Sequence, residues 1–233
     1  MVDPILSLKN ISFNYLIKNS FFNTQKILAL DDVSCEIKKN QKIGFIGSNG
    51  SGKSTIAKLI ANLILPDSGT IKNTFSSTFL LPNVLSFEKS LSGYDNIKVF
   101  INLMIHNPNK EYSEKILKKI IDFSELKDRI FDKVGSYSDG MHTRLAVSIL
   151  TFLEPGLLII DENIGAGDID FQKKTLNHFR NNIEKRTVIF ISHNFDLLKE
   201  FCDKSYWINN GKILDYGDTE KVYKKYTTYL NTI

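Results

Sequence analysis

The sequence contains one short loop whose residue types and spacing suit phosphate binding. It fits the pattern G-x-x-x-x-G-K-[ST], in which glycines let backbone N–H groups approach a polyphosphate and the lysine adds a positive charge. The apolar stretch Lys42–Ile46 precedes the loop and a helical pattern, Ile56–Ile64, follows it. A helix N-terminus also favours phosphate. The sequence therefore predicts a site for a nucleoside triphosphate, formed by Gly47, Ser48, Asn49, Gly50, Ser51, Gly52, Lys53, Ser54 and Thr55.

Oxygen ligands for a magnesium ion are also present. Ser54 offers a hydroxyl, and Asp161 follows the apolar strand Leu157–Ile160, where a carboxylate can hold Mg²⁺ through water. Glu162 comes next, and we expect it to orient or deprotonate the attacking water as a general base. The alternative for this acidic pair is a solvated turn after a strand.

Two further side chains have suggestive positions. His193 lies two residues beyond the apolar strand Val188–Ile191, where it could hydrogen-bond the γ-phosphate; the alternative is a histidine without a role. Tyr15 ends the first predicted strand and could stack on the nucleotide base. Packing is the alternative for Tyr15, and Phe13, Phe21 and Phe22 are nearby competitors for the stacking role.

The surrounding pattern predicts an α/β fold. An antiparallel sheet is expected from strands at 5–15 and 29–37, with the polar segment 18–26 as a loop between them. A helical subdomain is expected at about 86–153, inserted between strands of the core. Its helices are predicted at 94–105, 113–123 and 141–153. The apolar strands at 157–161 and 187–191 are typical of a parallel sheet covered on both faces. Further helices are predicted at 170–182, 195–202 and 219–230, and a hairpin at 205–209 and 212–216, turning at Asn210-Gly211.

The bulk composition is that of an ordinary globular protein. Of 233 residues, 42% are hydrophobic and 24% charged, and the net charge of +4 gives little support for nucleic-acid binding. The two cysteines, Cys35 and Cys202, are expected to be reduced packing residues. No signal peptide is expected at the N-terminus, and no apolar run reaches the 18 or so residues that a membrane span needs.

A second motif supports a family resemblance. Tyr137-Ser138-Asp139-Gly140-Met141 resembles the signature motif of ATP-binding cassette (ABC) ATPases, with Ser138 and Gly140 at matching positions. The phosphate loop, Asp161-Glu162, Asp168 and His193 extend the resemblance over nearly the whole chain. It implies one P-loop NTPase cassette spanning 1–233, with an antiparallel β subdomain and an inserted helical subdomain. It also implies a homodimer in which each ATP lies between the loop of one copy and Ser138 with Gly140 of the other, and it places Asp168 in the nucleotide site.

A narrower likeness concerns the exporters of capsular polysaccharide, O-antigen and teichoic acid. It rests on Leu91–Ile97, on Tyr137–Ala146, on Gly165–Lys174 and on Ile191–Asn194. This group implies an ATP-hydrolysing subunit at the cytoplasmic face of a bacterial membrane, working with a separate integral membrane permease. Another ABC importer or drug exporter is one alternative. A soluble ABC ATPase that remodels ribosomes or DNA is a second.

The sequence departs from the family pattern in two places. The glutamine usual near residues 78–82 is missing, with Asn83 or Glu88 as possible polar substitutes. Asp139 puts a carboxylate beside the expected γ-phosphate contact, and we expect its side chain to point away. Because some O-antigen relatives continue into a carbohydrate-binding domain, the end at Ile233 suggests that the permease selects the substrate.

Overall fold

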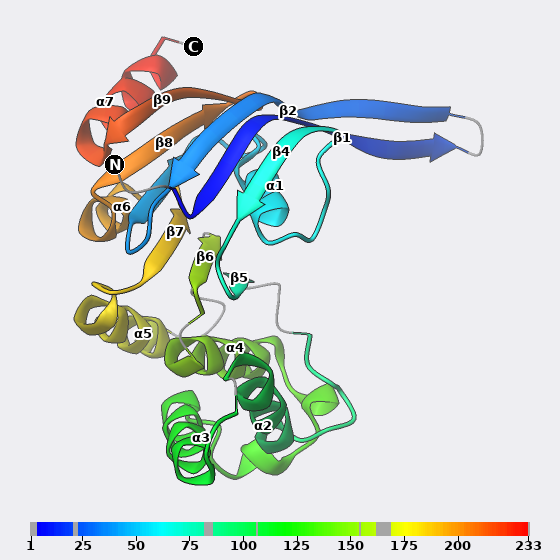
Figure 1. The fold of residues 1–233 in the computed structure, drawn as a ribbon, viewed down its shortest axis with the longest axis vertical. Coiled ribbons are helices and arrows are strands. Elements are labelled where there is room, and N and C mark those ends of the chain that lie inside the picture. Colours follow the sequence, from blue (N-terminus) through cyan, green and yellow to red (C-terminus); the bar gives the residue numbers. More distant parts are fainter. Residues whose placement is uncertain are drawn as a thin grey trace. The chain divides into compact units, whose positions relative to one another are not determined.

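The computed structural model describes residues 4–20, 23–81, 86–105, 107–153, 155–161 and 169–232 (Figure 1). The chain divides into two compact units. The first combines Met1–Leu80, Leu157–Glu162 and Lys185–Ile233, and the second combines Leu81–Gly156 and Asn163–Glu184.

A six-stranded sheet forms the centre of the first unit. Its order is β5 (Thr78–Leu81), β6 (Leu157–Asp161), β7 (Thr187–Ile191), β3 (Lys42–Ile46), β8 (Lys204–Asn209) and β9 (Lys212–Asp218). The neighbours β6, β7, β3 and β8 run parallel, and β9 returns antiparallel to β8. Strand β7 is buried throughout, as its apolar sequence predicts. Because β3, β6 and β7 are parallel and adjacent, their carboxyl ends lie at one edge of the sheet.

An antiparallel sheet completes the strands of this unit. Its order is β2 (Asn23–Ile37), β1 (Leu6–Ser20) and β4 (Ser68–Asn73). The predicted loop at 18–26 was wrong, because β1 continues to Ser20 and β2 begins at Asn23. Cross-strand pairs continue past Tyr15, including Ile17 with Gln25. Polarity does not determine whether a backbone pairs into a sheet, so it did not identify a loop here. Figure 1 shows this hairpin extending beyond the other strands of the unit.

Three helices belong to the first unit: α1 (Lys53–Ile60), α6 (Phe195–Phe201) and α7 (Thr219–Leu230). Helix α1 begins and ends earlier than the predicted 56–64. Gly52 in a left-handed conformation starts it, and the left-handed Asn62 follows its end. The turn between β8 and β9 has Asn210 and Gly211 at φ 47° and 75°, as the Asn-Gly hairpin signal predicts.

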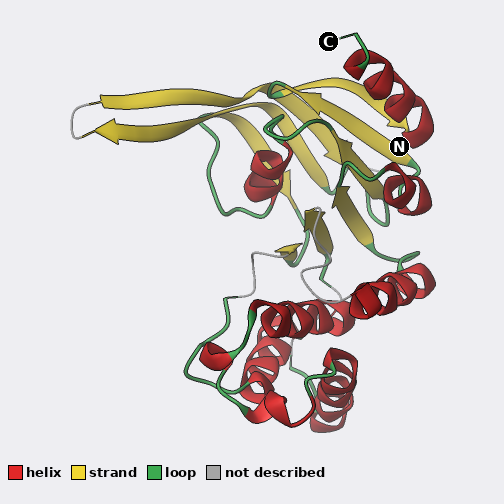
Figure 2. Cartoon of the chain, turned by 180° about the vertical axis from the view of Figure 1, so that it is seen from behind, coloured by secondary structure: helices red, strands yellow, loops and turns green. Residues whose placement is uncertain are grey.

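The second unit is helical (Figure 2). It contains α2 (Gly93–Met104), α3 (Lys110–Ser124), α4 (Asp139–Leu153), α5 (Ile169–Asn182) and two 3-10 turns, η1 (Lys127–Phe131) and η2 (Val134–Ser136). The predicted helical region, 86–153, did not include α5. This helix nevertheless packs on the others, since the ring of Phe171 lies 5.7 Å from that of Phe123 on α3.

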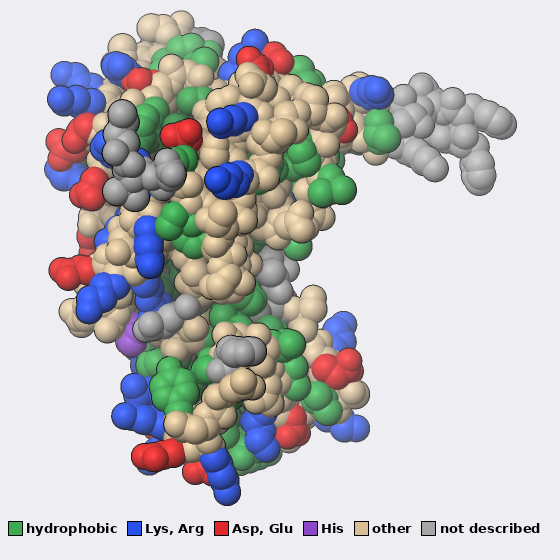
Figure 3. All heavy atoms as spheres, in the orientation of Figure 1, with side chains coloured by type: hydrophobic (Ala, Val, Ile, Leu, Met, Phe, Trp, Pro, Cys, Tyr) green, Lys and Arg blue, Asp and Glu red, His purple; other side chains and the backbone are tan. Residues whose placement is uncertain are grey.

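Surface charge and thiols are unremarkable in the described part of the chain. Figure 3 shows basic and acidic side chains interspersed on the visible face. Cys35 and Cys202 are buried free thiols, and burial raises the pKa of both. Among the described residues, no helix has the length and apolarity required to span a bilayer.

Candidate functional site

The phosphate loop follows β3 and leads directly into α1. Gly52 has φ 110°, and a Cβ at this position would lie 2.8 Å from Leu30 Cδ2 and 2.9 Å from the Ala29 carbonyl oxygen. Glycine at 52 is therefore required both by its backbone conformation and by the close approach of β2. Local pattern and tertiary packing thus agree on the path of the loop.

The β8–β9 turn supports the same loop from another side. The backbone N–H of Gly211 donates to the Ser51 carbonyl at 2.9 Å, and Asp31 N–H donates to the Gly211 carbonyl at 2.9 Å. A Cβ on Gly211 would lie 2.7 Å from the Ala29 carbonyl oxygen. The sequence identified Asn210-Gly211 as a turn, but its contact with the phosphate loop depends on the tertiary fold.

Lys53 is almost buried within the loop, at 6% exposure. Its Nζ donates to the carbonyl oxygens of Gly47 and Ser48, both at 2.8 Å. Burial lowers the pKa of Lys53, and the negative charge of Asp161 acts in the opposite direction. The ammonium group is thereby oriented by the loop and lies within electrostatic reach of a carboxylate.

A cavity of about 310 Å³ opens beside the loop. Tyr15 lies at its edge, and its hydroxyl is 3.3 Å from Thr55 Oγ1. The Tyr15 ring also makes an edge-to-face contact with Phe13, at 4.9 Å between centroids. The sequence did not point to Ile27, Leu28 and Ala29 as cavity residues. The cavity is lined by Tyr15, Ile27, Leu28, Ala29, Asn49, Gly50, Ser51, Gly52, Lys53, Ser54 and Thr55.

The sheet edge brings further predicted residues toward the loop. Asp161 ends β6 opposite Ile191, which is also the cross-strand partner of Phe45 in β3. His193 follows β7 by two residues and is exposed. The topology thus brings Asp161, His193 and the loop to one edge. Glu162 and Asp168 lie outside the described residues.

The segment Tyr137–Met141 belongs to the second unit. Ser138 is exposed; its Oγ accepts from Met141 N–H at 3.3 Å and its carbonyl accepts from His142 N–H at 2.9 Å, so it caps α4. A Cβ on Gly140 would meet no atom nearer than Ser138 Oγ, at 3.9 Å. No contact of the described chain requires glycine at 140.

Of the two residues that could replace the missing glutamine, Asn83 and Glu88, the structure describes only Glu88. Glu88 is exposed and accepts hydrogen bonds from the Ser90 hydroxyl at 2.7 Å and the Ser90 N–H at 3.1 Å, and these bonds lower the pKa of Glu88.

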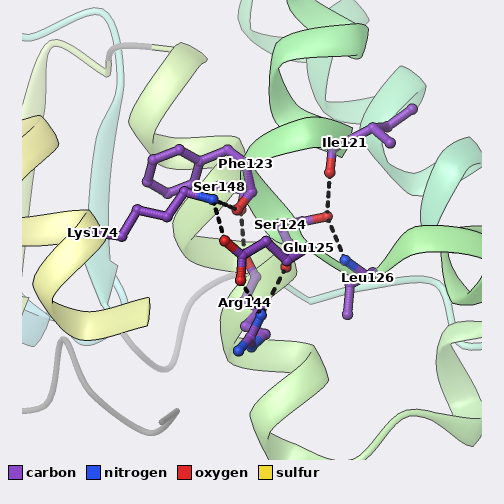
Figure 4. Close-up of polar contacts among 8 residues, drawn as sticks. All are labelled: Ile121, Phe123, Ser124, Glu125, Leu126, Arg144, Ser148 and Lys174. Atoms are coloured by element: carbon purple, nitrogen blue, oxygen red, sulfur yellow. Dashed lines mark hydrogen bonds and ion pairs between the residues drawn. The ribbon is translucent and has the colours of Figure 1, made fainter. Parts of the chain in front are cut away.

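An ion cluster joins three helices of the second unit (Figure 4). Glu125, which caps α3 in a left-handed conformation, accepts from Lys174 Nζ on α5 at 2.7 Å and from Arg144 Nη1 on α4 at 2.9 Å. Lys174 also donates to the Phe123 carbonyl at 2.9 Å. Arg144 stacks over the Phe171 ring, 4.8 Å from its centroid. No sequence pattern pointed to Glu125.

Comparison with known proteins decides the family. The sequence profile described as ABC transporter matches residues 30–165, more than half of the chain. The chain belongs to the ABC transporter family. As the ATPase of that family, this ABC protein binds and hydrolyses ATP.

Several relatives of this ABC protein carry export names. It is 38% identical to "Teichoic acids export ATP-binding protein TagH" of Staphylococcus haemolyticus, over 91% of the chain and 77% of that protein. It is 30% identical to "O-antigen export system ATP-binding protein RfbB" of Klebsiella pneumoniae, over 97% and 98%. The TagH of Shouchella clausii is 35% identical over 87% of the chain, which spans 56% of that relative's length.

The ABC cassette fold is confirmed by solved structures. The dimeric cassette MJ0796 in a post-hydrolysis state bound to ADP and Pi aligns with a TM-score of 0.72, over 92% of this chain and 98% of that one. The sequence identity is 19%, so this likeness concerns the fold.

Proposed function

We propose that this chain is the ATP-hydrolysing subunit of an exporter that moves a cell-surface polysaccharide across a bacterial membrane. The likeness to an O-antigen export protein over nearly the full length of both chains carries the proposal. The teichoic acid export relatives point to the same substrate class. The chain acts as one cassette over 1–233, at the cytoplasmic face of the membrane and bound to an integral membrane permease.

The residues around the phosphate loop fit ATP together with Mg²⁺. Tyr15 offers an aromatic face for the base, and the loop N–H groups with Lys53 neutralise the phosphates. The Ser54 hydroxyl and Asp161 carboxylate are oxygen donors of the kind Mg²⁺ prefers, and they would hold the ion, which supplies charge neutralisation during phosphoryl transfer. The loop and Asp161 lie at one sheet edge, which supports this assignment.

The remaining assigned residues act on the reaction itself. Glu162 orients the attacking water and accepts its proton, and His193 hydrogen-bonds the γ-phosphate. Two copies pair so that Ser138 and Gly140 of one close over the phosphates bound by the other, and Asp168 belongs to the same nucleotide site. Closing and opening of the pair drives the permease between two states. The dimeric MJ0796 cassette supports the paired arrangement.

Replacing Glu162 in the native organism tests the export proposal. Glu162→Gln keeps the shape of the side chain but removes its basicity, so we expect ATP binding to survive while hydrolysis and surface polysaccharide are both lost. Asp170→Asn, at the exposed start of α5, is the matched control and leaves both unchanged. Normal surface polysaccharide in cells whose purified Glu162→Gln protein no longer hydrolyses ATP would contradict the proposal.

A further inference from the structure

The residue before Ser138 is held by a hydrogen bond and by close packing. Tyr137 is buried, and its hydroxyl donates to the Arg129 carbonyl on η1 at 2.8 Å. Burial raises the pKa of Tyr137. The hydroxyl therefore binds the segment Tyr137–Met141 to η1, and it also packs against Gly93, the first residue of α2.

Glycine at 93 leaves the space that this hydroxyl occupies. A Cβ on Gly93 would overlap the Tyr137 hydroxyl oxygen and would lie 3.0 Å from the Ile130 carbonyl oxygen. Gly93 is not among the residues of positive φ. Close packing, and not backbone conformation, is what requires glycine at this position.

Backbone contacts strengthen the same junction. Gly93 N–H donates to the Asp132 carbonyl at 3.2 Å, while Val134 and Gly135 N–H groups donate to the carbonyls of Leu91 and Lys89 at 2.9 and 3.0 Å. The chain before α2 and the chain before α4 are thus joined along several residues. Ser138 follows this junction directly and caps the N-terminus of α4. The position of Ser138 therefore depends on the junction.

We propose that Gly93 and Tyr137 form a positioning pair that places Ser138 for the nucleotide of the second copy. This inference rests on the proposed function, in which Ser138 contacts phosphate across the dimer. Neither residue touches the nucleotide; both act through Ser138. The pair also connects two stretches of the sequence likeness, Leu91–Ile97 and Tyr137–Ala146, in one contact.

Three variants test the pair: Gly93→Ala, Tyr137→Phe and the double variant. A methyl group at 93 displaces the Tyr137 hydroxyl, and small displacements at a reacting site can cost about tenfold to a hundredfold in rate. We expect Gly93→Ala to lower ATP turnover and ATP-dependent dimer formation by about tenfold or more. Tyr137→Phe removes one hydrogen bond but keeps the ring, so its loss is smaller.

The double variant is the decisive one. Phenylalanine at 137 removes the oxygen that the new methyl group would overlap, so we expect Gly93→Ala/Tyr137→Phe to be more active than Gly93→Ala alone. Recovery is partial, because the Ile130 carbonyl remains close. ATP affinity of the monomeric chain stays within about twofold throughout, because the phosphate loop is unaltered.

Controls separate positioning from folding. Gly217→Ala is the matched glycine control, since its Cβ would meet no atom nearer than 4.0 Å, and Tyr112→Phe alters an exposed tyrosine of α3. Urea unfolding measures the folded fraction of each variant. A double variant no more active than Gly93→Ala, or activity that only follows the folded fraction, would overturn the inference. A wild-type chain that neither hydrolyses ATP nor dimerises with it would instead overturn the proposed function.

Discussion

The phosphate loop and the segment Tyr137–Met141 both contain a glycine within two residues of a serine, but glycine is present for different reasons in the two places. Gly52 is required by its own chain, through a left-handed conformation and the approach of Leu30 and Ala29. Gly140 has open space around it. In the proposed function, this open space is where the nucleotide bound by the second copy approaches. Glycine at 52 is therefore required by the chain that surrounds it, whereas no contact of the described chain requires glycine at 140.

Of the variants that test this comparison, removal of the loop lysine is expected to have the largest effect on ATP turnover. Lys53→Ala deletes the ammonium group that neutralises phosphate charge, and we expect ATP turnover to fall by about a hundredfold to a thousandfold. Phosphate release measures it. Lys58→Ala, in the last turn of the same helix, is the control and keeps normal turnover. Wild-type turnover in Lys53→Ala would contradict the assignment of phosphate binding to this loop.

Alanine at the two glycines tests their different causes directly. Gly52→Ala should lower the free energy of unfolding by about 2 kcal/mol, because a Cβ is strained and crowded there. Gly140→Ala should change it by less than about 0.5 kcal/mol and yet reduce turnover. Urea unfolding and phosphate release measure the two quantities. Equal losses of stability at both positions would show that the fold requires glycine at 140 as much as at 52.

The ion cluster of Glu125, Lys174 and Arg144 should have the smallest effect, and this effect is on the free energy of unfolding. Hydrogen bonding from Lys174, followed by that from Arg144, lowers the pKa of Glu125 below its ordinary value of 4.5. A carboxyl group whose pKa is lowered in the folded state stabilises the fold when the pH is above the ordinary pKa. This contribution decreases as the pH falls toward the folded-state pKa. Glu125 is 45% exposed, so solvent screening limits the effect to about 1 kcal/mol at most.

The matching measurement compares wild type with Glu125→Gln in urea between pH 7 and pH 4. We expect a small stability difference at pH 7 that narrows toward pH 4. Glu114→Gln, whose ion pair with Lys110 is 3.9 Å long and largely exposed, should show almost none. A difference for Glu125→Gln that grows toward acid would reverse the sign of the argument.

The sequence could predict features that lie within one short stretch of the chain, but not contacts between distant residues. The apolar strands, the phosphate loop between β3 and α1 and the Asn210-Gly211 turn are local patterns, and each was recognisable. The contact of Tyr137 with Gly93, of Gly211 with Ser51 and of Glu125 with Lys174 joins residues distant in sequence, so no local pattern contains it. The loop predicted at 18–26 was wrong because polarity indicates exposure and does not determine whether a backbone pairs.

In the proposed function one working ATP site needs two copies of the chain, and mixing two inactive variants tests this requirement most directly. Lys53→Ala lacks a working loop and Ser138→Ala lacks the closing serine. A mixed dimer of the two retains one intact site, formed by Lys53 of one copy and Ser138 of the other. With random pairing we predict that an equal mixture recovers about a quarter of wild-type ATP turnover. Turnover no higher than the average of the separate variants would contradict the claim.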